Sequence, residues 1–347
     1  GKILRVNKSF TELTGYASED VVGKSPRVLR SGRHSKEFYQ EMWQSILTKG
    51  FWEGEIWNRR KDGHEYLQRL TITCVEDESG EITHYVGDGQ DLTQRKQGEM
   101  DRAAIRAARK VQRTLFPSIA PCLPGFDIAG AVHPAERVSG DFFDYIPLGQ
   151  DSIGVLVADV MGHGLGPALL MSQTQAYLRA LAETCADPGE LLAGANRLFA
   201  TSDSGHFVTA FLGRLDALTR AFVYQGAGHQ AYLIRNDGAV RVLRSHSVPL
   251  GVEQSLSPCR TSKITLKPGD ILVVPTDGAE EAMNVDGRQF GREQIFELVR
   301  NNKDKPAVEI VDSLFRAARD FSDGQPQEDD ITVLVVKVLP MFVAETA

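Results

Sequence analysis

Four short acidic segments hold the residues best suited to chemistry in this sequence. They are Ser139–Asp144 (SGDFFD), Ala158–Gly164 (ADVMGHG), Pro275–Gly278 (PTDG) and Glu328–Thr332 (EDDIT). Each places an aspartate at the expected end of a strand or in a glycine-bearing turn, where a carboxylate projects from a rigid scaffold. Oxygen-rich sets without clustered histidine or cysteine suit Mg²⁺ or Mn²⁺ better than zinc. Together the four segments predict a site for hard divalent cations.

Each segment has a simpler interpretation when it is taken alone. Asp-Gly is first of all a turn signal, and Asp237-Gly238 and Asp286-Gly287 are interpreted as turns only. Asp277 differs, because a run of apolar residues leads directly into it. Asp329 and Asp330 are adjacent and would repel each other, which is more natural beside a cation than at an ordinary strand start. The metal interpretation therefore rests on the set of four.

The elements that must position these aspartates are mostly strands. Strands are predicted at Phe126–Val132, Phe142–Pro147, Ser152–Asp159, Val208–Asp216, Arg220–Gly226, Ala231–Arg235, Val240–Leu243, Ile271–Pro275 and Ile331–Val338. Helices are predicted at Gly166–Glu183, Pro188–Thr201, Arg292–Asn301 and Pro306–Asp320. Many strands and a few long helices without regular βαβ alternation favour an antiparallel α+β sandwich.

The first hundred residues predict a smaller α+β module. A short strand is expected at Ile3–Val6, and a helix with Phe10 and Leu13 on one face follows it. Ser35 is a candidate N-cap for a second helix. Strands are then expected at Trp52–Asn58, Tyr66–Val75 and Ile82–Gly87.

A polar, alanine-rich stretch after Thr93 is predicted to be helical as far as Phe116. Apolar or small side chains lie along one face of this helix, at Met100, Ala104, Ile105, Ala108, Val111 and Leu115. Such a stripe favours a coiled-coil seam between two copies of the chain. The alternative is a helix packed on its own domain, because the stripe covers few heptads. Prolines at 117, 121 and 124 close the helix and mark a boundary.

Composition is that of an ordinary globular protein, and 347 residues suit two domains. The formal net charge of −7 gives no reason to expect a nucleic-acid or membrane partner. No apolar run reaches membrane-spanning length. Four widely spaced cysteines without a CxxC pair favour the reducing cytoplasm. The chain opens at Gly1 without methionine, so an upstream segment is expected.

The N-terminal residues resemble a PAS sensor domain. The segments that carry this resemblance are VNKSFTELTGY, GFWEGEIWNRRKDGHEY and VGDGQDLTQRK, and the opening strand usual in the family is absent. Asp91, Thr93 and Arg95 match the exit motif, where the last strand of such domains leads into an output helix.

A PAS cofactor is a further question that the resemblance raises. The cysteine motif of flavin-adduct photoreceptors is absent. Trp52 and Asn58 stand where some FAD-binding relatives place contacts, although Trp52 is more simply a core aromatic. His34 as a haem ligand is the weaker hypothesis. The sensed ligand is therefore left open.

The chain from about Ala108 to Val338 resembles the PPM phosphatase superfamily, in the bacterial SpoIIE-type branch that regulates sigma-factor partner switching. Eight segments in family order carry this resemblance: ARKVQRTLFP, VSGDFFDY, VADVMGHGLGPALLM, HFVTAFLGRLD, YQGAGHQAYLI, PLGV, GDILVVPTDGAEEAMNVDGRQFG and EDDITVLVV. The two resemblances imply a PAS domain at residues 1–93, a signalling helix at 94–120 and a phosphatase domain at 121–340.

The second resemblance implies roles for individual residues. Asp159 would bridge two ions, Mn²⁺ or Mg²⁺, and the backbone carbonyl of Val160 would complete one site. Asp277 and Asp329 would bind the other ion, and Asp141 would contribute directly or through water.

Other positions have less definite roles. Asp144 is a candidate for a supporting or structural role, and Asp330 remains a candidate among the aspartates of the metal site. His163 is a hypothetical general acid, with a solvent-facing loop histidine as the alternative. His229 either supports a turn or contacts substrate. The segment Gly166–Glu183 corresponds to a regulatory switch of the family, which movement of the linker helix would shift.

The expected function is therefore a cytoplasmic, sensor-regulated phosphoserine/phosphothreonine phosphatase, in which a metal-bridging hydroxide attacks phosphorus. Its implied substrate is a phosphorylated anti-sigma-factor antagonist. One alternative is a non-catalytic interaction module with the same fold, which the retained acidic positions disfavour. The other is a hydrolase of small phosphoesters or nucleotides, which the absence of a P-loop weakens without excluding.

Overall fold

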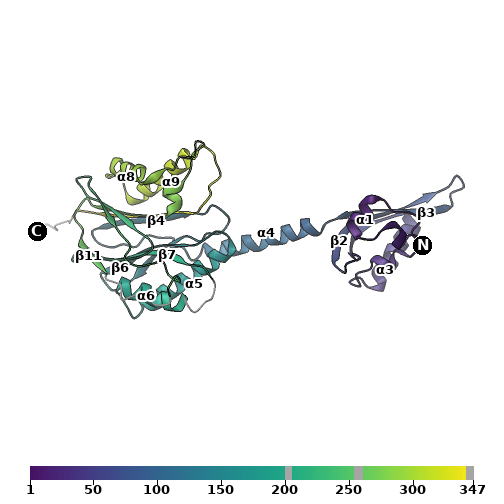
Figure 1. Cartoon of the computed structure of the whole chain (residues 1–347), viewed down its shortest axis with the longest axis horizontal. Coiled ribbons are helices and arrows are strands. Elements are labelled where there is room, and N and C mark those ends of the chain that lie inside the picture. The colour runs from purple at the N-terminus through teal and green to yellow at the C-terminus, as the bar shows by residue number, and fades with distance from the viewer. Residues whose placement is uncertain (200–204, 254–260, 341–347) are drawn as a thin grey trace, which may run out of the picture. The chain divides into compact units, whose positions relative to one another are not determined.

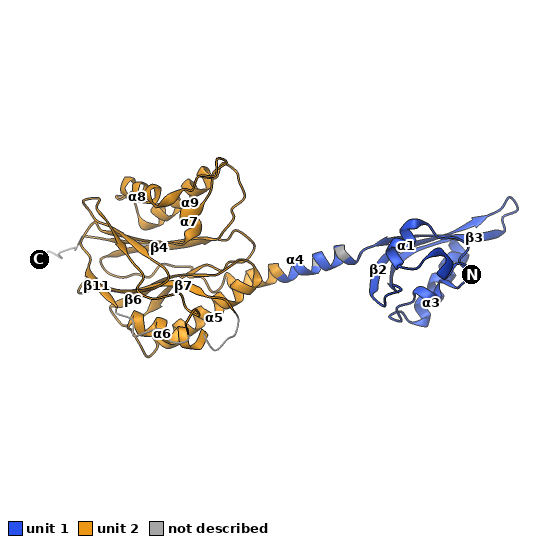
Figure 2. Cartoon of the chain, in the orientation of Figure 1, with its two compact units in different colours: residues 1–104 blue, residues 105–347 orange. Residues whose placement is uncertain are grey.

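The computed structural model describes residues 1–199, 205–253 and 261–340. The chain forms two compact units, unit 1 at residues 1–104 and unit 2 from Ile105 onward (Figure 2). Each unit has its own strands and helices.

Unit 1 is a three-stranded antiparallel sheet preceded by short helices. The helices are α1 (Lys8–Thr14), α2 (Ser18–Val21), the 3₁₀ turn η1 (Pro26–Leu29) and α3 (Lys36–Lys49). The strands β1 (Phe51–Arg59), β2 (Glu65–Glu76) and β3 (Ile82–Asp91) pair in that order. The Ser35 side chain accepts a hydrogen bond from the Phe38 N–H at the start of α3, as the sequence predicts for an N-cap.

The predicted strand Ile3–Val6 is wrong, because these residues form no strand. Ile3 exchanges only two backbone hydrogen bonds with the turn at Gly23 and Lys24. A strand needs a continuous ladder with a neighbour, and the described sheet of unit 1 consists of β1, β2 and β3 without this segment.

Helix α4 runs from Thr93 to Gln112 and ends four residues before the predicted Phe116. Its last turn tightens, because the Leu115 N–H donates to the Gln112 carbonyl at 2.9 Å instead of continuing the α-helical pattern. The side chains of Met100 and Val111 are 67% and 65% exposed. The apolar stripe is therefore not fully covered by its own chain.

Unit 2 contains two five-stranded sheets packed face to face. One has the order β10-β9-β12-β13-β4 and the other β11-β8-β7-β6-β5. The strands are β4 (Phe126–His133), β5 (Phe142–Pro147), β6 (Ser152–Val160), β7 (Val208–Asp216), β8 (Ala221–Ala227), β9 (Ala231–Ile234), β10 (Val240–Leu243), β11 (Ser262–Thr265), β12 (Ile271–Pro275) and β13 (Ile331–Val338). All neighbouring strands pair antiparallel, which confirms the α+β sandwich.

Helices cover both outer faces of this sandwich (Figure 1). They are α5 (Leu165–Ala182), α6 (Pro188–Phe199), α7 (Asp277–Glu281), α8 (Gly291–Asn301) and α9 (Ala307–Phe321). Successive side chains of β13 point alternately into the core between the sheets and towards the covering helices. Leu334 and Val336 enter the core between the sheets, whereas Val333 and Val335 pack against α8 and α9. Nearly continuous hydrophobicity in such a strand follows from burial on both faces.

Strand β11 and the short helix α7 were not predicted from the sequence. The predicted helix Pro188–Thr201 is observed as far as Phe199, and Thr201 lies outside the described residues. Cys74, Cys122 and Cys185 are free thiols, and Cys259 is likewise outside that range. No helix in the described part of the chain has the length and apolar character needed to cross a membrane.

Candidate metal centre

Asp159 lies one residue before the end of β6, opposite Thr209 of β7 in the register. The chain then turns through Gly162 and Gly164, whose φ angles are 88° and 90°. Only glycine adopts these positive φ angles without steric cost, and the sequence has glycine at both positions. This turn leads directly into α5.

Asp277 begins α7 immediately after β12, and Asp329 precedes β13, the neighbour of β12 in the sheet. The two loops are in close contact, because a Cβ built on Gly278 would lie 2.1 Å from the Asp330 carbonyl oxygen. Only glycine allows this approach. The PTDG and EDDIT segments therefore meet at one sheet edge.

Asp141 is almost fully buried in the loop before β5. The Thr276 hydroxyl donates a hydrogen bond to its Oδ2 at 2.7 Å, and the same hydroxyl oxygen accepts the Thr332 N–H at 2.9 Å. Thr276 thereby connects Asp141 to both strands that carry Asp277 and Asp329. Thr276 belongs to the PTDG segment, but no role for it was predicted from the sequence; its position directly before Asp277 is the signal that could have identified it.

The carboxylates of this region influence one another electrostatically. Burial, followed by the charge of Asp159, raises the pKa of Asp141 well above its usual value. Burial raises the pKa of Asp159 to about 6, and Asp277 and Asp329 contribute to this rise. The pKa of Asp329 is raised by burial and then by Asp277. Four carboxylates from distant parts of the sequence therefore share one field of excess negative charge, which a cation would relieve.

The side chains do not converge as a finished coordination sphere. Among the described residues, no three or more histidine, cysteine, aspartate or glutamate side chains are close enough to hold a metal ion as they lie. Asp277 Oδ1 instead accepts the Gly278 N–H at 2.9 Å, and Asp329 Oδ1 accepts the Asp330 N–H at 2.8 Å. The all-oxygen donor set fits a hard divalent cation. To coordinate such an ion together, the side chains of Asp277 and Asp329 would have to rotate away from these backbone N–H groups.

The carbonyl of Val160, the fifth predicted ligand, lies beside the Asp141 loop. A Cβ built on Gly140 would be 3.0 Å from the Val160 carbonyl oxygen and 3.2 Å from that of Gly162. The loops that carry Asp141 and Asp159 are therefore in backbone contact.

Asp330 has a structural environment rather than that of a free ligand. Its Oδ1 accepts the Ala135 N–H, and its Oδ2 accepts the Ser139 hydroxyl and the Gly140 N–H, all at 2.8 Å. Its side chain is buried, with the residue 3% exposed. Asp330 thus fixes the loop that carries Asp141.

Asp144 is also fully buried and bound by neighbouring side chains. Arg179 of α5 donates from Nε and from a terminal nitrogen to the two carboxylate oxygens, at 2.6 and 2.7 Å. Gln175 donates to Oδ2 at 3.0 Å. Asp144 therefore holds helix α5 against β5, which is a supporting role. Gln175 and Arg179 carry no sequence signal that would have identified them.

The two histidines have different environments. His163 is 64% exposed in its side chain and lies 2.8 Å from Glu136. His229 is buried, with Nδ1 3.1 Å from the Thr209 hydroxyl and Nε2 2.9 Å from the Pro275 carbonyl. Burial lowers the pKa of His229 to about 4, so its ring is neutral at physiological pH. It joins β7 to the end of β12, just before Asp277.

Gln112, the last residue of α4, makes contacts with Ser139 that could not be predicted from the sequence. Its side chain is buried; Nε2 donates to the Ser139 carbonyl at 2.7 Å and Oε1 accepts the Ser139 N–H at 3.0 Å. Gln175 of α5 also donates to the Leu115 carbonyl at 3.0 Å. The end of α4 is thus bonded to the loop of Asp141 and to α5.

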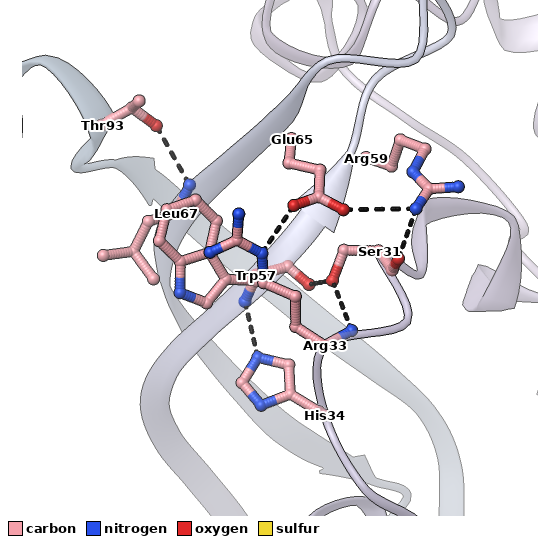
Figure 3. Close-up of polar contacts among 8 residues, drawn as sticks. All are labelled: Ser31, Arg33, His34, Trp57, Arg59, Glu65, Leu67 and Thr93. Atoms are coloured by element: carbon pink, nitrogen blue, oxygen red, sulfur yellow. Dashed lines mark hydrogen bonds and ion pairs between the residues drawn. The ribbon is translucent and has the colours of Figure 1, made fainter.

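In unit 1, the residues considered above as cofactor contacts, His34, Trp52 and Asn58, are buried or in contact with other protein groups. The Nε2 atom of His34 accepts the Trp57 N–H at 2.8 Å (Figure 3), and its ring stacks on Phe38 at 4.1 Å. Trp52 packs edge-on against Phe38, and Asn58 is buried. Nε2 of His34, the atom a haem iron would need, is therefore already used.

The exit motif is anchored at the start of α4. The Thr93 hydroxyl accepts the Leu67 N–H at 3.0 Å (Figure 3), and Asp91 Oδ1 accepts the Thr93 N–H at 2.8 Å. Asp91 Oδ2 also pairs with Arg60 at 2.7 Å. The first residue of α4 is therefore fixed to β2 and β3.

Two sequence families match the chain. Residues 149–339 match "Stage II sporulation protein E (SpoIIE)" and residues 1–94 match the PAS domain. The phosphoserine phosphatase RsbU of Bacillus subtilis is 28% identical over 239 residues, covering 68% of this chain and 70% of RsbU. The nitrogen fixation regulatory protein of Klebsiella oxytoca is 37% identical over 91 residues, covering 26% of this chain and 18% of that protein.

A solved structure shares the fold of unit 2. The SiaA-PP2C domain of Pseudomonas aeruginosa superposes with a TM-score of 0.62 at 24% identity, covering 70% of this chain and 98% of that one. The chain therefore belongs to the SpoIIE family and carries a PAS domain ahead of its SpoIIE domain, and unit 2 has the fold of the SiaA-PP2C domain.

Proposed function

We propose that this chain is a sensor-regulated, metal-dependent phosphatase of phosphoserine and phosphothreonine in proteins. The observation that carries the proposal is the meeting of the four segments that hold Asp141, Asp159, Asp277 and Asp329, joined by the Thr276 hydrogen bonds and by close backbone contacts at Gly140 and Gly278. Such a concentration of carboxylates is costly without cations. The functional divisions proposed are a PAS domain at residues 1–93, a signalling helix at 94–120 and a phosphatase domain at 121–340.

The site residues divide into ligands and supports. Asp159, Asp277, Asp329, Asp141 and the carbonyl of Val160 would hold two ions, Mn²⁺ or Mg²⁺. When bound, such a pair supplies an activated water and neutralises phosphoryl oxygens. Other residues of the chain position the ligand Asp141: Thr276 orients its carboxylate, and Asp330 holds the loop that carries it. No cysteine or serine nucleophile is required.

The proposed substrate is a phosphorylated anti-sigma-factor antagonist in the cytoplasm. Two observations support it: the resemblance to the branch that regulates sigma-factor partner switching, and the similarity to RsbU, named a phosphoserine phosphatase.

Phosphate release from a phosphoserine peptide with and without Mn²⁺ tests the activity. Asp159→Ala and Asp277→Ala should each lower the metal-stimulated rate by at least about 100-fold, since one transition-state interaction contributes about that much. Asp237→Ala is the matched control, because Asp237 precedes a glycine in the same way but only caps an exposed turn at the Ala239 N–H. Full activity in either site variant would refute the assignment.

The same assay separates the alternatives. A non-catalytic interaction module would release no phosphate from any phosphopeptide with either metal. A hydrolase of small phosphoesters would cleave p-nitrophenyl phosphate and leave phosphopeptides intact.

Control is proposed to enter through α4, because Gln112 bonds the end of this helix to the backbone of Ser139, two residues before Asp141. A shift of the helix would displace the loop and, through Gln175, helix α5. Gln112→Ala should weaken Mn²⁺ binding about tenfold by calorimetry, whereas exposed Lys110→Ala should not. Equal affinity in both variants would exclude this route.

A homodimer through α4 is also proposed, since its stripe leaves Met100 and Val111 exposed. Light scattering of Val111→Glu should show a shift towards monomer relative to the unsubstituted chain. A monomeric unsubstituted chain would contradict the proposal.

A further inference from the structure

A groove of about 570 Å³ opens beside the candidate metal centre. It lies between the segment after α7, helix α9 and the loop before β13. Gly278 and Asp329 are part of its lining, so it is continuous with the proposed site of phosphate hydrolysis. Its volume falls in the range of specific binding sites.

The groove has apolar surface at its base and on one wall. Phe315 and Ile331 line it from the core, each 7% exposed. Met283 and Val285 line the opposite wall with 43% and 60% of their surface exposed. Exposed apolar side chains gathered at a hollow mark a place where another molecule binds.

Both walls are held in shape by hydrogen bonds. Asn284 Oδ1 accepts the N–H groups of Asp286 and Arg288 at 3.0 and 2.9 Å, which fixes the turn that carries Val285. On the other wall, Gln327 Nε2 donates to the carbonyls of His133 and Asp329 at 2.7 Å each. The groove is therefore preformed, which lowers the entropic cost of binding.

The charged residues of the lining are acidic on balance. Arg316 and Arg319 line the groove together with four carboxylates, those of Glu281, Asp312, Glu328 and Asp329. An acidic side chain is therefore disfavoured in the groove, and the apolar surface favours an uncharged apolar one.

We propose that this groove is a specificity subsite, which takes an apolar side chain of the phosphoprotein within a few residues of the phosphorylated one. Gly278 and Asp329 line the groove and also belong to the proposed metal centre, so a polypeptide whose phosphate lies at the bound ions would place neighbouring residues beside the groove. The apolar side chain would pack between Val285 and Phe315. This inference rests on the proposed phosphatase function and adds the sequence preference of that site.

The test uses two phosphoserine peptides that differ only in the three residues on either side, leucine in one and alanine in the other. The unsubstituted chain should hydrolyse the leucine peptide with kcat/KM about tenfold higher, since a few methylenes in an apolar pocket discriminate by at least that factor. Val285→Asp should bring the ratio close to about one. Val308→Asp is the matched control, because Val308 is 55% exposed and does not line the groove; it should keep the preference.

The outcomes separate the two levels of inference. Equal rates on both peptides in the unsubstituted chain, or a preference that survives Val285→Asp, would overturn the subsite while leaving the phosphatase intact. No hydrolysis of either peptide or of p-nitrophenyl phosphate would instead remove the proposed function. Val285 is exposed on a turn, so its substitution should leave the melting temperature within about 2 °C of the unsubstituted value, and this check accompanies the kinetics.

Discussion

Asp329 and Asp330 are adjacent in sequence, yet the structure predicts opposite consequences for the same substitution. In Asp330→Asn, an NH₂ group must replace one carboxylate oxygen. That group would face donors, because Asp330 accepts from the Ala135 N–H, the Ser139 hydroxyl and the Gly140 N–H. At least one buried donor loses its acceptor, and the remaining bonds lose their charge.

The magnitude follows from these contacts. An unsatisfied buried donor costs about 1–3 kcal/mol, and hydrogen bonds to a charged group contribute about 1.5–3 kcal/mol each. Asp330→Asn should therefore lower the free energy of unfolding by about 2–4 kcal/mol. For a unit of this size, that corresponds to a melting temperature roughly 4–16 °C lower.

Asp329→Asn should leave stability unchanged or slightly higher in the absence of metal. Its Oδ1 can still accept the Asp330 N–H. Its raised pKa, caused by burial and then by Asp277, means that the folded state disfavours the charge that the amide removes. As a proposed ligand, however, its loss should weaken Mn²⁺ binding at least about tenfold.

Far-UV circular dichroism is the appropriate assay for unfolding, because all three tryptophans, Trp43, Trp52 and Trp57, lie in unit 1. Calorimetry measures Mn²⁺ binding to both variants. The reasoning is refuted when Asp330→Asn melts within about 1 °C of the unsubstituted chain, or when Asp329→Asn is the less stable of the two.

Three further results are expected. In EDTA, lowering the pH from 8 to 5 should raise the melting temperature of the unsubstituted chain relative to that of Asp159→Asn, because folding raises the pKa of Asp159 to about 6 and its stabilising protonation is lost as pH rises through that value. The comparison cancels the opposite effect of His229, whose pKa burial lowers to about 4 in both chains. The same pH dependence in both chains would contradict this. Arg179→Ala should destabilise unit 2 by about 2–4 kcal/mol in urea unfolding, since Asp144 would stay buried without its cation. Adding Asp144→Asn to this variant should restore part of the lost stability. If the double variant is as unstable as Arg179→Ala, the ion pair is not the cause of the loss. His163→Gln should leave the dependence of rate on leaving-group pKa unchanged, because the side chain is exposed beside Glu136; a steeper dependence would establish a general acid.

Most strands and helices could be predicted from local pattern. Alternation and apolar runs specified Phe142–Pro147, Val208–Asp216 and Ile331–Val338 to the residue. Short elements without such a pattern were not predicted, as Ser262–Thr265 shows. Its one buried residue, Ile264, joins the core between the sheets, where the pairing with β8 places it. Ile3–Val6 has strand-forming residues but no neighbouring strand to pair with, and pairing is a tertiary property.

The sequence by itself determined which residue types were available for chemistry and where each aspartate stood relative to a strand or turn. Only the tertiary structure distinguished Asp329, whose Oδ1 accepts the neighbouring Asp330 N–H, from Asp330, which is buried and accepts from three donors of a distant loop. It likewise showed that Thr276 holds Asp141 and that Gln112 holds the loop before it. These contacts join residues as far as 195 positions apart. Local pattern records a residue's preference for a strand, turn or helix, whereas hydrogen-bond partners and burial depend on which distant segments the fold brings together.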